Sequence, residues 1–152
     1  MNKNSRNWYK ITIIIMVLIA AGLGVFWALS KKPKTASTEP SKSDLIHVES
    51  PQPNQIIESP LLVTGEARGS WFFEASFPVV LVNWDGLIIA QGVATAQGEW
   101  TTNNFVPFTA TLTFTADKNA YSNKGALILR KDNPSSLPEH DDSIEIPIMF
   151  AK

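Results

Sequence analysis

The stretch that decides the fold is VPFTATLTFT, residues 106–115, in which every second side chain is apolar. Val106, Phe108, Ala110, Leu112 and Phe114 alternate with one proline and four threonines. Successive side chains of a strand point to opposite faces of a sheet, so this period of two predicts a half-buried strand with a threonine outer face.

The same alternation occurs on both sides of this stretch. It predicts a strand over residues 144–150, and another over residues 73–81 with Phe72, Glu74 and Ser76 on the outer face. Shorter candidates are residues 45–49, 61–66 and 126–131. Asp85-Gly86, which separates VVLVNW from LIIAQG, predicts a tight hairpin in which both central residues take positive φ.

Seven or eight short strands fall within residues 45–152, and no clear amphipathic helix lies among them. This pattern predicts an all-β fold, an antiparallel β-sandwich, with a small barrel as the structural alternative. The chain has no cysteine, which excludes a disulfide framework, a thiolate zinc site and a cysteine nucleophile.

Residues 11–29 form an uncharged apolar run that would span roughly 28 Å as a helix, close to the hydrocarbon thickness of a bilayer. We therefore predict a cytoplasmic head (1–10), a transmembrane signal anchor (11–29), a flexible linker (30–44) and a β-sandwich domain (45–152). Cleavage of a signal peptide after Ser30 is the alternative. The expected location is the bacterial cytoplasmic membrane, with a single pass and the C-terminal domain outside.

Charge is distributed unevenly along the chain. Residues 1–34 carry six basic and no acidic side chains, whereas residues 35–152 carry seven basic and fourteen acidic ones. A nucleic-acid-binding domain needs a basic surface, so the acidic body predicts that no nucleic acid is bound. The expected partners are the membrane, through residues 11–29, and an envelope protein or wall polymer.

Several motifs resemble a known family when they are read in order. They are SPLLVTGEAR (59–68), WFFEA (71–75), Asp85-Gly86, GEW (98–100), Pro107-Phe108, KDNPS (131–135) and IPI (146–148). Together they resemble the immunoglobulin-like domain of bacterial spore germination, the second Gmad domain type, over about Ile46 to Phe150. Ser136 stands where the family pattern would carry glycine.

The resemblance implies an immunoglobulin-like sandwich displayed in the bacterial cell envelope, with a link to sporulation or germination. It carries no catalytic residues over to this chain. Enzyme chemistry is also poorly supported by the residues, because His47 and His140 lie far apart in sequence and no nucleophile-elbow motif occurs. Glu74 and Glu99, each beside aromatic residues, are the one candidate pair for a cell-wall hydrolase. We predict no enzyme activity and no cofactor.

Residues 132–142 are rich in oxygen-bearing side chains. Asp132, Glu139, Asp141 and Asp142 are weak candidates for calcium ligands, but their spacing does not match an EF-hand loop. Two prolines in the segment favour a solvated crossover instead, and we predict no metal site.

Five residues are the candidates for partner binding: Arg68, Trp71, Phe72, Glu74 and Trp100. Arginine and aromatic residues dominate interface hot spots, and an outward Phe72 beside an Arg68–Glu74 pair would form such a surface. Trp84 ranks lower because it adjoins the hairpin turn. The predicted function is a non-catalytic, membrane-anchored domain that binds an envelope partner; the alternatives are a carbohydrate- or peptidoglycan-binding module and, more weakly, a wall hydrolase.

Overall fold

The computed structural model describes residues 42–151. The predicted head, the predicted membrane segment 11–29 and the first part of the predicted linker lie outside the described residues. Across residues 42–151, no helix has the length and apolar character needed to cross a bilayer. The last three residues of the predicted linker form a 3-10 helix, η1 (Lys42–Asp44), and are part of the folded domain.

Eight strands and two further 3-10 helices make up the rest of the domain. The strands are β1 (Ile46–Ser50), β2 (Ile56–Ile57), β3 (Leu61–Arg68), β4 (Ser76–Asn83), β5 (Ile88–Ala96), β6 (Phe105–Leu112), β7 (Lys124–Arg130) and β8 (Ser143–Phe150). The 3-10 helices are η2 (Gly69–Trp71) and η3 (Pro138–His140). The all-β prediction is confirmed.

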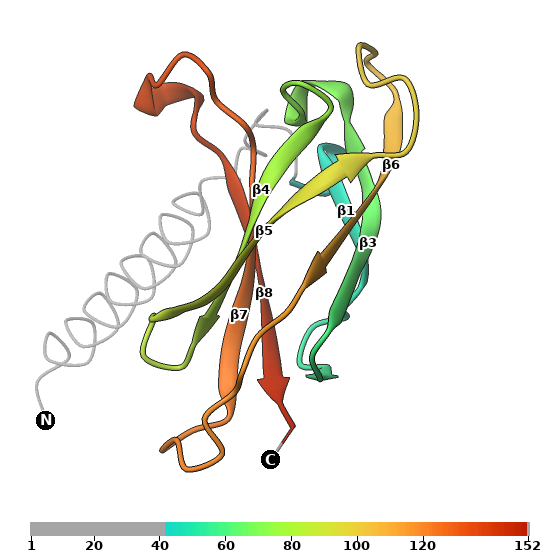
Figure 1. Cartoon of the computed structure of the whole chain (residues 1–152). Helices are drawn as coiled ribbons and strands as arrows, with labels where there is room; N and C mark the ends of the chain where they lie inside the picture. The colour runs from blue at the N-terminus through green and yellow to red at the C-terminus, as the bar shows by residue number, and fades with distance from the viewer. Residues whose placement is uncertain (1–41, 152) are drawn as a thin grey trace, which may run out of the picture. The chain divides into compact units, whose positions relative to one another are not determined.

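The strands form one curled sheet in the order β1-β3-β6-β5-β4-β7-β8-β2. Only two residue pairs join β5 to β6, and at this point the sheet bends so that β3 and β6 face β4 and β7 across the core (Figure 1). All neighbours pair antiparallel except β2 and β8, which pair in parallel. The predicted antiparallel arrangement therefore holds for every strand pair except the one at the β2 edge.

The core follows from the period-two pattern. In β6, Val106, Phe108, Ala110 and Leu112 are all buried, and the threonines and proline between them are not. β8 buries Ile146, Ile148 and Phe150 in the same way. These side chains meet those of β3, β4 and β7 in a single buried apolar cluster.

The start of β4 differs from its prediction. Alternation over residues 73–81 predicted one strand, but β4 begins at Ser76. Glu74 (φ 48°) and Ala75 (φ 60°) form a two-residue turn, across which Phe73 and Ser76 exchange backbone hydrogen bonds of 3.0 Å. The turn reverses the chain, so Phe72 enters the core and Phe73 is 40% exposed.

The β4–β5 hairpin is present, but its turn is not the one predicted. Gly86 has a φ of 79°, whereas Asp85 has no positive φ. The Gly86 N–H donates to the Asn83 carbonyl and the Asn83 N–H donates to the Leu87 carbonyl, each at 3.0 Å. This four-residue loop needs the left-handed conformation only at Gly86, where glycine adopts it without steric cost.

Candidate functional site

Two of the five predicted partner-binding residues lie inside the domain. Trp71 is 1% exposed and Phe72 is 4% exposed. Both pack against Phe77, with ring centroids 6.5 Å and 5.2 Å away. The expectation that Phe72 faces outward was wrong, because the 74–75 turn reverses the side on which this segment points.

Arg68 makes contacts that connect parts of the domain, instead of the predicted pair with Glu74. Its Nε donates to the Asp44 carbonyl and its Nη1 to the Asn103 carbonyl, both at 3.0 Å. The guanidinium also lies 3.9 Å from the ring centroid of Phe105. Arg68 thus joins η1 to the loop before β6, and the predicted pairing with Glu74 was wrong.

Trp100 and its neighbours form the loop between β5 and β6. Trp100 is partly buried against the core. The Glu99 carboxylate accepts hydrogen bonds from the Thr101 hydroxyl and from the Thr101 N–H, the latter at 2.9 Å. These bonds lower the pKa of Glu99 because they favour its charged form. A glycosidase acid needs the opposite, a carboxyl whose pKa is raised.

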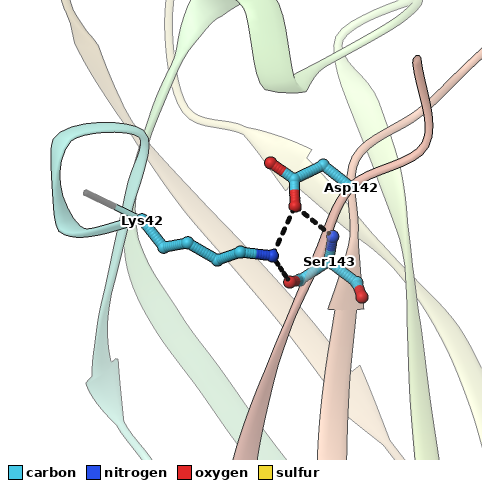
Figure 2. A network of polar contacts seen from close by, with 3 residues as sticks. All are labelled: Lys42, Asp142 and Ser143. Carbon is cyan, nitrogen blue, oxygen red and sulfur yellow. Dashed lines mark hydrogen bonds and ion pairs between the residues drawn. The ribbon is translucent and has the colours of Figure 1, made fainter. Parts of the chain in front are cut away.

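Two carboxylates of the acidic loop, those of Asp141 and Asp142, make contacts with the protein. Lys42 Nζ lies 2.5 Å from Asp142 Oδ1 and donates to the Ser143 carbonyl at 2.6 Å, which joins η1 to the start of β8 (Figure 2). Asp141 Oδ1 accepts from Asn133 Nδ2 at 2.8 Å. Among residues 42–151, no three histidine or carboxylate side chains gather into a group that could hold a metal ion, so Asp132, Glu139, Asp141 and Asp142 form no such group.

The same loop holds a serine–histidine contact that the sequence did not indicate. Ser135 Oγ lies 3.0 Å from His140 Nδ1 and 2.5 Å from Asn133 Oδ1. An amide oxygen only accepts, so the hydroxyl donates to Asn133 and His140 Nδ1 must donate to the hydroxyl. A nitrogen that carries a proton cannot remove one from serine, and the contact shapes the loop.

The most exposed aromatic group lies at the other end of the domain. Figure 1 shows the β4–β5 hairpin and the segment leading into β7 at one end, and the β7–β8 loop at the other. Trp84 is 46% exposed and Tyr121 is 90% exposed, and their ring centroids are 5.6 Å apart at 52°. Leu87 (64%) and Ile88 (45%) continue the apolar surface along the hairpin. We call Trp84, Leu87, Ile88 and Tyr121 the hairpin-end surface.

Two hollows flank Trp84. The first, about 300 Å³, has an apolar wall that includes Leu87, Ile89 and Phe150, and polar side chains that include Asn123. The second, about 640 Å³, is a shallow groove over the outer face of β4 and β7, with Tyr121 at its edge. Both volumes lie within the roughly 300–1,000 Å³ typical of small-molecule sites.

Hydrogen bonds in the hairpin fix the position of Trp84. The side-chain oxygen of Asn83 accepts from the N–H groups of Asp85 (3.0 Å) and Leu87 (2.9 Å), on either side of the turn. A side-chain bond of this kind mimics a backbone turn and limits the motion of the loop. The exposed Trp84 ring is therefore carried on a defined backbone.

Sequence reasoning ranked Trp84 low and did not select Tyr121. Trp84 follows a predicted strand and precedes Asp-Gly, which places it at a hairpin tip. This position was the sequence signal that could have predicted its exposure. Tyr121 precedes a cluster of turn residues, Ser122-Asn123-Lys124-Gly125, and nothing in its local sequence indicates contact with a residue 37 positions earlier.

Comparison with known protein families finds a match to this chain. The family model described as the immunoglobulin-like domain of bacterial spore germination matches residues 45–136. The matched range includes Trp84, Tyr121 and β1 to β7, and ends at Ser136, before β8. No curated protein and no solved structure matches the chain.

Proposed function

Because the chain belongs to the family of immunoglobulin-like domains of bacterial spore germination, we propose that it is a non-catalytic binding module of the bacterial envelope. Residues 11–29 hold it at the cytoplasmic membrane, and the β-sandwich outside binds an envelope component. The hairpin-end surface is the binding site.

The exposed Trp84–Tyr121 pair is the observation that carries this proposal. Large aromatic side chains are normally buried when no partner covers them, and they are enriched at interfaces. Here Trp84, on the hydrogen-bonded hairpin turn, contacts Tyr121 of the segment before β7. Leu87 and Ile88 are exposed beside Trp84 in the sequence of the hairpin, and polar side chains such as Asn83 and Ser122 line both hollows. The hydrophobic centre and polar rim are the arrangement found in binding sites.

The position of this surface also suits a tethered module. Lys42, the first described residue, contacts Ser143 at the start of β8, while Phe150 at the end of β8 lines the hollow beside Trp84. Seven residue steps along a strand cover roughly 23 Å. The surface therefore lies far from the point at which the chain enters the domain. A linker attached at that point would leave the hairpin-end surface accessible.

We propose a non-catalytic function because the chemistry of the candidate catalytic residues does not suit hydrolysis. Hydrogen bonds from Thr101 hold Glu99 in its charged form, and the Ser135 hydroxyl donates to the side-chain oxygen of Asn133. A charged Glu99 carboxylate is not a proton donor, and a serine hydroxyl that donates to an amide oxygen is not activated as a nucleophile. A wall hydrolase is accordingly not the function that we propose.

Single cysteines test the proposal, because the chain has none of its own. Intact cells carrying Asn2→Cys, Leu87→Cys or Phe73→Cys would be treated with a membrane-impermeant maleimide. We expect no labelling at position 2, which lies in the cytoplasm, and labelling at position 73. Position 87 should react several-fold more slowly in cells than in the purified chain, because a bound partner covers it, whereas position 73 should react at similar rates in both.

Labelling at position 2 in intact cells would contradict the membrane orientation. Equal rates at position 87 in cells and in the purified chain would contradict binding through the hairpin-end surface.

A further inference from the structure

We propose that the hairpin-end surface binds an uncharged saccharide chain, whose rings stack on Trp84 and Tyr121. This inference rests on the proposed function and specifies its ligand class. It is carried by the two aromatic rings, by the two hollows beside them and by the charges in those hollows.

The aromatic pair presents ring faces in two directions. The centroids of Trp84 and Tyr121 are 5.6 Å apart and their planes differ by 52°, so the rings do not cover one another as a parallel stack would. The apolar C–H face of a pyranose ring packs on an aromatic ring, while its hydroxyl groups point outward to polar partners. A tyrosine that is 90% exposed and a tryptophan that is 46% exposed provide such faces.

The hollows lie in a row, with Trp84 between them. Asn83, Trp84 and Ser122 line both hollows, so a linear ligand that crosses Trp84 can occupy both. A polysaccharide meets this requirement because its rings repeat along a chain. A single small metabolite would occupy one hollow and leave the other empty.

The charges in the hollows match a neutral ligand. The first hollow has one acid and one base, Asp117 and Lys118, and so does the second, with Glu145 and Lys124. Each hollow is therefore neutral in sum, so neither attracts a polyanion or a polycation by long-range forces. Carboxylates accept and ammonium groups donate hydrogen bonds, and sugar hydroxyl groups do both.

The test uses the full-length chain in detergent micelles and two probes. One is the tetrasaccharide of β-1,4-linked N-acetylglucosamine, which is uncharged. The other is peptidoglycan glycan strands freed of their peptides, in which every N-acetylmuramic acid carries a free carboxylate. Binding is measured by calorimetry for the wild-type chain and for Trp84→Ala, Trp84→Phe and Tyr121→Ala. Phe73→Ala is the matched control, an exposed aromatic residue of the β3–β4 connection, and near-UV circular dichroism reports whether each variant is folded.

We expect the charged glycan strands to bind weakly and the uncharged tetrasaccharide to bind saturably. Trp84→Ala should weaken tetrasaccharide binding about tenfold, the equivalent of 1.4 kcal/mol; Tyr121→Ala should weaken it several-fold; Trp84→Phe should retain most of it; and Phe73→Ala should leave it unchanged. Binding that survives Trp84→Ala in a folded protein would overturn the inference.

Failure of the saccharide inference is distinguishable from failure of the proposed function. If the tetrasaccharide does not bind while Leu87→Cys is still protected in cells, the inference of an uncharged saccharide is wrong and the proposed function stands. Binding of the glycan strands alone would then assign the site to an anionic saccharide, and binding of neither probe would assign it to a protein partner. If neither glycan binds and position 87 is unprotected, both the inference and the proposed function are wrong.

Discussion

Phe72 and Phe73 are neighbours in sequence whose replacement by alanine should have very different effects on stability. Phe72 is 4% exposed and packs 5.2 Å from Phe77, whereas Phe73 is 40% exposed at the mouth of the 74–75 turn. The alternating pattern of the sequence predicted the reverse. The pair therefore tests the turn and the packing together.

The size of each effect follows from burial. Emptying a buried phenylalanine site costs about 3–5 kcal/mol, which includes the cavity that remains. That range includes the free energy lost with the tilted Phe72–Phe77 ring contact, because an aromatic pair contributes about 0.5–1.5 kcal/mol beyond its buried area. Phe73→Ala keeps the backbone hydrogen bonds of the turn and should cost about 1 kcal/mol or less.

The assay is urea unfolding of a fragment covering residues 42–152, with tryptophan fluorescence as the signal. The wild-type fragment must first unfold in a single transition, which we expect because its core is continuous and requires no metal or disulfide. Phe72→Ala should then unfold at a much lower urea concentration than Phe73→Ala. If Phe73→Ala is the more destabilising variant, or if both cost less than about 1 kcal/mol, the turn and the burial of Phe72 are refuted.

Three further predictions concern single residues. Gly65→Ala should destabilise the domain by about 1–3 kcal/mol, because the new Cβ would lie 2.1 Å from a backbone oxygen of β1. Gly98→Ala is the control: its Cβ would have no atom within 4 Å, so the unfolding free energy should change by about 0.5 kcal/mol or less. Ser136→Gly should stabilise the domain by about 0.5–1 kcal/mol in the same urea assay, because Ser136 has a φ of 56°, a left-handed conformation that costs non-glycine residues energy; an unchanged or lower midpoint would contradict this. Thr101→Ala should raise the pKa of the Glu99 carboxyl toward its ordinary value in an NMR titration, since the lost hydroxyl bond is the main cause of the lowered pKa. The stabilisation linked to Glu99 is present above the ordinary pKa and is lost as the pH falls through the folded pKa, and an unshifted titration in the variant would refute its origin.

The strands were most predictable where buried and exposed side chains alternate. β6 and β8 match their predicted alternation, whereas β4 buries Val80 in addition to the predicted Phe77, Val79 and Leu81. The failure before β4 has a physical cause: Glu74 and Ala75 adopt positive φ without glycine or asparagine, so their sequence carries no turn signal. Tertiary packing of Phe72 outweighs the local preference of these residues.

The candidate site was less predictable than the fold. Exposed aromatic residues at a domain end depend on which loops meet there, and the contact between Trp84 and Tyr121 joins two loops separated by β5 and β6. Arg68 was predicted to bind a partner, but its guanidinium donates to two backbone carbonyl groups of the domain, which any residue type could supply. Side-chain identity alone did not reveal these contacts.

Photo-crosslinking in intact cells tests most directly the claim that the domain binds an envelope component through its hairpin end. A photoreactive residue at position 87 of the full-length chain should form an adduct with an envelope protein or glycan, and the adduct should disappear when Trp84 is replaced by alanine. The same residue at position 73, in the connection between β3 and β4, should form none. Adducts at position 73 with none at position 87 would contradict the account and return the binding site to the Arg68–Glu74 end of the domain.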